Sequence, residues 1–250
     1  MFFITSHPLA ASGSSDQSSG EGLTPPTDWE ILLQDEFEDN RNDWDIGVSD
    51  KDRVRFKWQI IEGKYRWEAH PYDSFGFLSI PDHDPVEDFY LSVDIRKIAG
   101  PDYARYGIIF RTDGDSWYML SIHDPGQYSL WRWHNGEYVA LIWSRKTDAI
   151  HPGQVNHIEL MAVGPEISIA INGQLVTGVN DDTAQQGWIG LYTHMSKAGE
   201  DAIFEFDNLV LRGPKSEDSP QDVQDSRDLE QRIADYQDDL TEYRRVGDKS

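Results

Sequence analysis

The middle of the chain is a succession of short runs in which apolar and polar residues alternate, and this pattern restricts the fold more than any other feature. From about residue 29 to residue 212, turn dipeptides such as Asn-Gly and Pro-Gly separate the runs. Runs of period two that are joined by such dipeptides are typical of antiparallel hairpins. In the clearest case, residues 166–171 place three isoleucines on one face, and Asn172-Gly173 leads into the next run. No run alternates with a long helical period, so we expect an all-β chain with about a dozen strands in a two-sheet jelly-roll sandwich.

Changes in composition divide the chain into three parts. Residues 1–27 are mostly small polar residues, Gly and Pro, which bury too little surface to offset the entropy of ordering, so we expect a disordered tail. Residues 28–213 carry the strands, and residues 214–250 form an acidic linker and a helix. The apolar start of the tail is too short for a convincing signal peptide, although its Leu-Ala-Ala-Ser resembles a cleavage site.

The last part of the chain carries a helical pattern. Residues 214–250 contain six basic and eleven acidic residues, and apolar residues recur there at steps of three and four. This pattern predicts an amphipathic helix, which is marginal alone and needs a partner surface. We expect the helix to dock on its own sandwich in a monomer, with helix-mediated association as the alternative. The apolar stripe consists of Leu229, Ile233, Tyr236, Leu240 and Tyr243.

Charge and composition exclude several classes of protein. The chain of 250 residues has 22 basic and 45 acidic residues and a formal net charge of −23. No basic stripe could follow a phosphate backbone, so we expect no nucleic-acid partner. No apolar run of about 18 residues is present, so we expect no membrane-spanning segment. The absence of cysteine excludes disulfides, thiol nucleophiles and zinc–thiolate sites.

Several segments between Leu33 and Leu211 carry a resemblance to a known family. In chain order they are QDEFEDNRNDW, IIEGKYRWEA, FYLSVDIRK, YGIIFRTDGDSWYMLSI, YSLWRWHNGEYVAL, NHIELMAVGPEISIAINGQLV, GWIGLYT and FEFDNLVLR. In this order they resemble a bacterial concanavalin A-like lectin/glucanase domain, and more narrowly the laminin-G-like and 3-keto-disaccharide-hydrolase-like jelly rolls. The resemblance implies two sheets, one of them concave, and a superfamily that includes sugar-binding modules, sugar hydrolases and adhesion domains.

Catalytic patterns are weak in this sequence. Laminarinase-type members of the superfamily place three carboxylates in one cleft with the pattern E-x-D-x-E, which this chain lacks. The nearest pair, Glu205 and Asp207, has two acids on one face of the closing strand. The eight histidines are scattered, and no Gly-x-Ser-x-Gly elbow is present. We therefore lean against an enzyme.

The resemblance implies a possible structural calcium ion. In sugar-binding jelly rolls, acidic residues of the opening strand often share a Ca²⁺ with an aspartate of the closing strand. Here these would be Asp35 or Glu36 with Asp207. The alternative is that these acids are solvated at strand ends, and no Asp-x-Asp-x-Asp-Gly loop supports the metal.

Aromatic residues offer the best candidate binding site, because the apolar face of a pyranose ring stacks on aromatic rings. Period two places Trp131 and Trp133 on one face of their strand and Arg132 on the other. Together with Trp117 and Tyr128, these three form the candidate ligand-binding set, and packing alone is the alternative.

These features together lead us to expect a non-catalytic carbohydrate-binding or adhesion-like module. A sugar hydrolase of the 3-keto-disaccharide type and a scaffold that uses the C-terminal helix remain the alternatives. We expect an extracellular or cell-surface location, while the weak signal peptide leaves the cytoplasm open.

Overall fold

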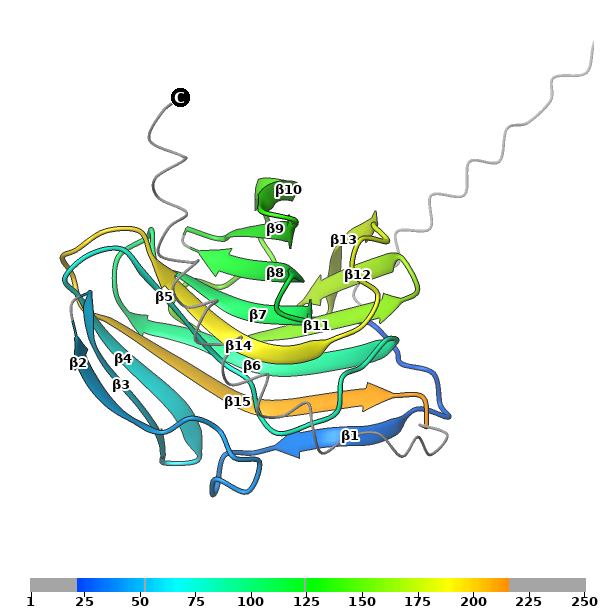
Figure 1. The fold of residues 1–250 in the computed structure, drawn as a ribbon, viewed down its shortest axis with the longest axis horizontal. Coiled ribbons are helices and arrows are strands. Elements are labelled where there is room, and N and C mark those ends of the chain that lie inside the picture. The colour runs from blue at the N-terminus through cyan, green and yellow to red at the C-terminus, as the bar shows by residue number, and fades with distance from the viewer. Residues whose placement is uncertain (1–21, 52, 124, 216–250) are drawn as a thin grey trace, which may run out of the picture.

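The computed structural model describes residues 22–51, 53–123 and 125–215, which form strands, turns and bends without a helix. The strands make two antiparallel sheets (Figure 1), so the predicted all-β, two-sheet class is confirmed. The described residues form fifteen strands, slightly more than the dozen or so that the sequence suggested. Most of the predicted tail and the predicted C-terminal helix lie outside the described residues.

One sheet has nine strands in the order β13-β12-β11-β6-β15-β4-β3-β2. The ninth strand, β1, pairs with the second half of β15, on the side where β4 pairs with its first half. The strands of this sheet are β1 (Glu30–Asp35), β2 (Gly47–Lys51), β3 (Val54–Ile61), β4 (Lys64–Pro71), β6 (Phe89–Ala99), β11 (Asn156–Val163), β12 (Glu166–Ile171), β13 (Gln174–Asn180) and β15 (Ala202–Gly213).

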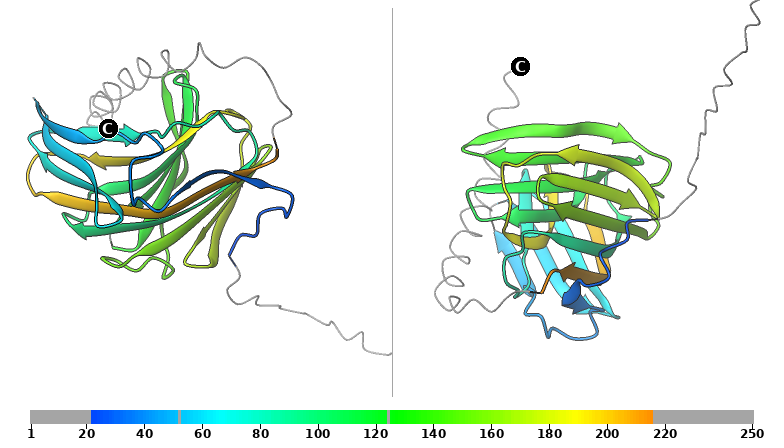
Figure 2. Two further views of the ribbon diagram at one scale, coloured as in Figure 1. Left: turned by 90° about the horizontal axis from the view of Figure 1, so that it is seen from below. Right: turned by 90° about the vertical axis from the view of Figure 1, so that its right-hand side faces the viewer.

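The other sheet has six strands in the order β10-β9-β8-β7-β14-β5. Figure 2 shows the two sheets as curved layers, with β2, β3 and β4 at one end of the molecule. The strands of this sheet are β5 (Phe75–Ser79), β7 (Arg105–Thr112), β8 (Ser116–His123), β9 (Gln127–His134), β10 (Glu137–Lys146) and β14 (Trp188–Met195).

Two-residue turns set the register of the hairpins that the sequence predicted. Asn172 and Gly173, between β12 and β13, both have positive φ, as do Asn135 and Gly136 between β9 and β10. Positive φ at both positions matches the right-handed twist of the flanking strands, and Asn-Gly adopts it with little strain. These turns place the side chains of each strand on defined faces.

The hydrophobic core lies between the two sheets. Strands such as β4, β6 and β12 contribute every second residue to it, as expected for a sandwich. Tyr65 and Trp67 of β4 contact Phe206 of β15, and all three side chains are buried. The buried apolar side chains between the sheets form one contiguous cluster. In the part of the chain that the structure describes, no helix could cross a membrane.

Candidate functional site

The outward side chains of the six-stranded sheet line up in rows, because antiparallel pairing places partner residues side by side. In the first row, Trp117 of β8, Trp133 of β9 and Tyr138 of β10 are consecutive partners. The Trp117 and Trp133 rings stack with centroids 5.2 Å apart and planes at 18°. The Trp133 and Tyr138 centroids are 4.5 Å apart. Three aromatic rings therefore form a continuous surface across three strands.

The second row is aliphatic at its centre and aromatic at its edge. Ile109, Met119, Trp131 and Ala140 are successive partners on β7, β8, β9 and β10. Trp143, further along the edge strand β10, packs against Trp131 with centroids 5.1 Å apart and an interplanar angle of 60°. The Trp143 residue is 70% exposed, which is unusual for tryptophan and places an accessible ring beside the row.

The third row is polar. Tyr192 of β14 pairs with Gly107 of β7, which pairs with Ser121 of β8. The hydroxyl groups of Tyr192 and Ser121 are hydrogen-bonded, so the Tyr192 side chain crosses β7 where Gly107 has no side chain. Burial raises the pKa of Tyr192, so the phenol stays neutral at physiological pH. This hydrogen bond connects β14 to β8 on the outer face.

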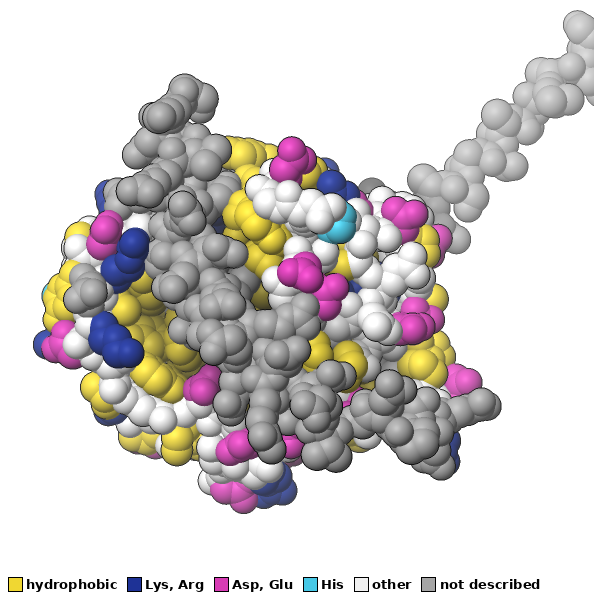
Figure 3. Space-filling model, viewed as in Figure 1, with side chains coloured by type: hydrophobic (Ala, Val, Ile, Leu, Met, Phe, Trp, Pro, Cys, Tyr) yellow, Lys and Arg dark blue, Asp and Glu magenta, His cyan; other side chains and the backbone are white. Residues whose placement is uncertain are grey.

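We call Trp117, Trp131, Trp133, Tyr138 and Trp143 the aromatic face. Figure 3 shows hydrophobic side chains gathered on the side of the molecule seen in Figure 1, including over β8, β9 and β10. Polar groups border the first row at the β9–β10 turn. The Nδ1 atom of His134 is 2.7 Å from the Ser116 hydroxyl, and its Nε2 atom is 2.7 Å from the Asn135 side-chain amide. By alternation, His134 and Ser116 lie on the opposite side of their strands from Trp133 and Trp117, so these polar groups mark the end of the strands beside the aromatic face.

The structure brings together three residues of the predicted ligand-binding set and places the other two elsewhere. Trp117, Trp131 and Trp133 belong to the aromatic face. Tyr128 is buried in the core between the sheets, and its hydroxyl donates to the Val176 carbonyl at 2.8 Å. Tyr128 shares the parity of Leu130 rather than that of Trp131, so alternation alone would have placed it there.

Arg132 also lies on the opposite side of β9 from the two tryptophans, as alternation predicted. Its Nη1 group donates to Asp181 Oδ2 and to Thr183 Oγ1, both at 2.7 Å. Burial favours a raised pKa for Asp181, but hydrogen bonds from Tyr118 and Thr183 and the Arg132 charge bring the pKa below its ordinary value. Arg132 therefore holds the segment after β13 against the six-stranded sheet.

The three predicted calcium ligands do not form one cluster. Asp35 is buried, and its carboxylate accepts hydrogen bonds from Phe37 N, Asn42 Nδ2 and Trp44 Nε1 at 2.7–2.8 Å. These N–H donors occupy both oxygens that a calcium ion would use, and they order the loop after β1. Asp207 pairs with Lys64, and Glu36 is exposed. Among the described residues, no three His, Asp or Glu side chains are arranged to hold a metal ion. The calcium site remains a prediction that these contacts do not favour.

The carboxylate pair of the closing strand faces away from the aromatic face. Glu205 and Asp207 lie on the outer side of the nine-stranded sheet, because Phe204 and Phe206 point into the core. Arg66 donates to Glu205 Oε1 from Nε at 2.9 Å and from Nη2 at 2.5 Å. A cation therefore neutralises each carboxylate, which favours a structural role for both.

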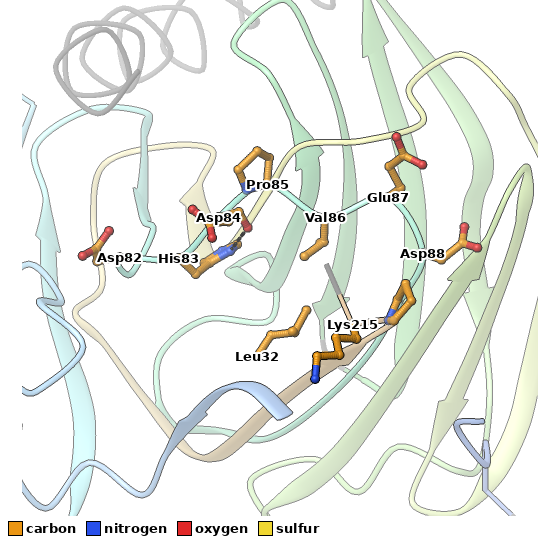
Figure 4. A pocket seen from close by; sticks show the side chains of 10 residues that line it. Leu32, Asp82, His83, Asp84, Pro85, Val86, Glu87, Asp88 and Lys215 are labelled. Carbon is orange, nitrogen blue, oxygen red and sulfur yellow. Dashed lines mark hydrogen bonds between the residues drawn. The ribbon is translucent and has the colours of Figure 1, made fainter. Parts of the chain in front are cut away.

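A shallow pocket of about 530 Å³ lies where the β5–β6 loop meets the end of β15. Its lining includes His83, four acidic residues of the loop, Leu32 and Lys215 (Figure 4). The carboxylates of Asp82, Glu87 and Asp88 point in different directions in Figure 4. The carboxylates that line this pocket therefore do not converge on one point, as a catalytic or metal site would require.

His83 has a structural task in this loop. The ring accepts a hydrogen bond from Ile189 N–H at Nε2, 3.2 Å away, and donates from Nδ1 to the Asp84 carbonyl at 2.6 Å. Burial lowers its pKa, so the ring is held neutral. These bonds attach the β5–β6 loop to β14.

Sequence reasoning missed two members of the aromatic face, Tyr138 and Trp143. Both lie on β10, whose pairing with β9 shifts register between Ala140 and Ile142 and again between Ile142 and Arg145. Each bulge changes the face on which later side chains lie, so period two cannot be extended through the strand. The partnership of Tyr138 with Trp133 could have been read from the Asn135-Gly136 turn.

Comparison with known proteins places this geometry in context. Residues 26–212 match the family model described as the 3-keto-alpha-glucoside-1,2-lyase-like domain. No curated protein sequence matches the chain.

Solved structures with the same fold include several glucanases. SCLam, a non-specific endo-beta-1,3(4)-glucanase of family GH16, has a TM-score of 0.56 and 11% identity, covering 78% of this chain and 95% of its own. The endo-1,3-beta-glucanase (laminarinase) catalytic domain of Thermotoga petrophila has a TM-score of 0.54 and 9% identity, covering 76% and 99%. The carbohydrate-binding module CBM66 of Bacillus subtilis has a TM-score of 0.49 and 18% identity, covering 77% and 99%. At these identities the two glucanase structures show a shared fold and nothing more.

Proposed function

We propose that this chain, which belongs to the 3-keto-alpha-glucoside-1,2-lyase-like domain family, binds carbohydrate. We propose further that it is a non-catalytic module and that it binds through its aromatic face. The observation that carries the proposal is the exposed Trp143 ring beside Trp131, next to the Trp117–Trp133–Tyr138 row. These rings lie outside the core between the sheets. Trp117 and Trp131 are buried, whereas the Trp143 ring is exposed, and an exposed tryptophan beside further aromatic rings supports binding.

The chemistry of a sugar fits this surface. One face of a pyranose ring presents C–H groups, which pack on an indole or phenol ring, while hydroxyl groups project from its edge. The tryptophan rings supply the apolar contact, and the side-chain amide of Asn135, in the turn after β9, supplies a hydrogen-bonding group. The preference would be for a neutral glycan, because no Asp, Glu, Lys or Arg belongs to the first two rows.

Binding fits the described groups better than hydrolysis by two carboxylates does. Such hydrolysis needs an acid and a nucleophile or base on either side of the glycosidic bond. Glu205 and Asp207 lie on the other sheet and are paired with cations. The family description supports a second candidate, turnover of a 3-keto-glucoside, and the same experiment distinguishes the two.

The test combines a binding assay and a turnover assay on the full chain. We would titrate it with laminarin, a soluble β-1,3-glucan, by calorimetry, and follow reducing-sugar release and 3-keto-glucoside consumption in parallel. We expect saturable binding without turnover. Turnover of either substrate would overturn the non-catalytic assignment, and inactivity in both assays, extended to a glycan array, would favour a scaffold.

Variants of the aromatic face locate the binding site. Trp143→Ala and Trp133→Ala should each weaken glycan binding by at least about tenfold, since truncating an aromatic anchor of an interface typically costs more than about 1.4 kcal/mol. Leu175→Ala is the matched control, because Leu175 is a 57% exposed apolar residue on β13 of the other sheet. Equal loss in the control and the tryptophan variants would contradict the site.

A further inference from the structure

The dipeptide Asn-Gly occurs twice in the chain, and both copies form the turn of a hairpin at the edge of a sheet. Asn135-Gly136 joins β9 to the edge strand β10, and Asn172-Gly173 joins β12 to the edge strand β13. The two turns have nearly the same backbone conformation, with φ of 51° and 82° in the first and 50° and 76° in the second. Any difference in the chemistry of the two turns must therefore come from what their side chains contact.

An asparagine that precedes glycine can lose its side-chain amide without an enzyme. The glycine backbone nitrogen gives its proton to a base in the solvent and attacks the asparagine Cγ, so that an N–Cγ bond forms and the Cγ–Nδ2 bond breaks. The leaving nitrogen takes up a proton and departs as ammonia, which leaves a cyclic imide. Water then opens either bond between the imide nitrogen and a carbonyl carbon, and the product is aspartate or isoaspartate. Glycine favours the first step because it has no side chain and adopts many backbone angles.

The two glycines are equally open to this reaction. At Gly136 and at Gly173, no atom of the described residues other than the adjacent ones lies within 4 Å of the place where a Cβ would stand. Each asparagine must rotate its side chain and change its backbone angles before Cγ can reach the glycine nitrogen. The rate of the reaction therefore depends on how firmly each asparagine is held.

The Asn172 side chain is held by another part of the chain. Its Nδ2 group donates to the Ala149 carbonyl at 2.7 Å and to Asn156 Oδ1 at 2.9 Å. Its Oδ1 atom accepts a hydrogen bond from His157 N at 2.8 Å, and its own backbone N–H donates to the His157 carbonyl at 2.8 Å. Reaction at Asn172 would have to break bonds to β11 and to the segment that precedes β11.

The Asn135 side chain is bonded within its own turn. Its Nδ2 group lies 2.7 Å from Nε2 of His134, the preceding residue. Because the two residues are adjacent, this bond moves with the turn. The pairing of β9 with β10 also shifts register twice, whereas the pairing of β12 with β13 shifts once, so the ladder behind Asn135 is interrupted more often. Asn135 is therefore held less firmly than Asn172.

We propose that Asn135 is a site of spontaneous deamidation in the folded protein, and that Asn172 is protected from the same reaction by its bonds to β11 and the preceding segment. Conversion replaces a neutral amide with a carboxylate, and isoaspartate also adds a methylene group to the backbone of the turn. Trp133 and Tyr138, which are paired close to this turn, have ring centroids 4.5 Å apart. The modification would therefore change the surface at one end of the aromatic face.

The reaction can be followed without any ligand. We would incubate the full chain at mildly alkaline pH, digest it, and measure conversion at each asparagine by mass spectrometry. The same chain in guanidinium chloride gives the reference rate at each site, because the denaturant removes the contacts of the fold. We expect similar rates at the two sites in denaturant. In the folded chain, Asn135 should convert at least about tenfold faster than Asn172, because several hydrogen bonds must break before Asn172 reacts.

Two results would overturn the proposal. One is equal conversion of Asn135 and Asn172 in the folded chain, or faster conversion of Asn172. The other is no measurable conversion of Asn135 over several half-times of the denatured chain.

A variant tests whether the bonds of Asn172 cause its protection. Asn156→Ala removes one acceptor of the Asn172 side chain and should speed conversion of Asn172 at least about threefold, while Asn135 serves as the internal control. An unchanged rate at Asn172 would contradict protection by this bond. If both sites rose to their rates in denaturant, the variant would be unfolded, and the comparison of the two sites in the unchanged chain would decide alone.

The consequence for binding rests on the proposed function and is tested separately. Asn135→Asp reproduces one product, and Gln174→Glu makes the same chemical change at an exposed residue beside the turn of the other hairpin. Asn135→Asp should weaken laminarin binding at least about threefold, because a carboxylate lacks the N–H donors of the amide, and Gln174→Glu should leave it unchanged. Equal affinities would retain the modification site and reject its effect on binding. Conversion of Asn135 in a chain that does not bind laminarin in any form would retain the site and reject the proposed function for this glycan.

Discussion

The outer faces of the two sheets differ in chemistry although the same alternation builds both. On the nine-stranded sheet the outward side chains form ion pairs, such as Arg66 with Glu205 and Lys64 with Asp207. On the six-stranded sheet they form aromatic and aliphatic rows. Paired charges make a sheet face that is satisfied by its own contacts, whereas an apolar face requires a further partner. The comparison therefore points to the six-stranded sheet as the functional surface.

The largest expected effect concerns how closely the strands pack in each sheet. A methyl group at Gly107 of β7 would clash with the carbonyl oxygen of Leu120 on the neighbouring strand. At Gly178 of β13, in the other sheet, the nearest atom to such a group would be Ser168 Oγ at 4.0 Å. We expect Gly107→Ala to destabilise the chain by about 3 kcal/mol, because the backbone must move.

Gly178→Ala is the matched control for this substitution. Its stability should change by less than about 1 kcal/mol, because alanine has space there and restricts the unfolded chain. Urea unfolding followed by tryptophan fluorescence measures both variants. Equal stabilities would show that β7 tolerates a side chain, and the account of how Tyr192 crosses it would need revision.

A smaller effect should separate stability from binding on the nine-stranded sheet. Arg66→Met leaves the Glu205 carboxylate, which is 11% exposed, without the guanidinium that donates two hydrogen bonds to it. Because Arg66 is 26% exposed, we expect a loss of only about 1 kcal/mol in the free energy of unfolding. Laminarin affinity should stay unchanged. If Arg66→Met lost laminarin binding and Trp143→Ala did not, the binding site would lie on the nine-stranded sheet.

The sequence predicted the core-facing side of the nine-stranded sheet better than the outer face of the six-stranded sheet. Alternation in residues 166–171 correctly placed Ile167, Ile169 and Ile171 in the core. The same rule placed Trp131 and Trp133 together on one face. Alternation cannot, however, identify which sheet a strand joins, because this depends on pairings between residues far apart in the chain. The contact of Trp143 with Trp131 could not be predicted either, because two register shifts in the β9–β10 pairing interrupt the alternation along β10.

A still smaller effect, dependent on pH, should arise from His83 at the edge of the six-stranded sheet. Burial lowers the pKa of His83 in the folded chain, whereas an unfolded histidine has a pKa of about 6.5. Below that pH the unfolded chain binds more protons at this site, so stability falls as the pH falls, and it is level above. Chemical unfolding at a series of pH values should show a shallower decline for His83→Gln than for the unchanged chain. Parallel curves would assign the decline to other groups.

The smallest expected effect is the response to calcium at the β1–β15 junction of the nine-stranded sheet. A cation that binds only the folded chain raises its melting temperature by mass action. Here three N–H groups donate to Asp35, and Lys64 is paired with Asp207, so a calcium ion would have to displace hydrogen bonds and an ion pair. We therefore expect the melting temperature to differ by less than about 1 °C between excess chelator and millimolar calcium. Such a difference corresponds to a change of at most a few tenths of a kcal/mol in the free energy of unfolding. Magnesium at the same concentration controls for ionic strength. A rise of several degrees in the melting temperature with calcium alone, lost in Asp207→Asn, would establish the metal site that the resemblance implies. It would also show that a carboxylate of this sheet binds a metal ion in preference to its side-chain partner.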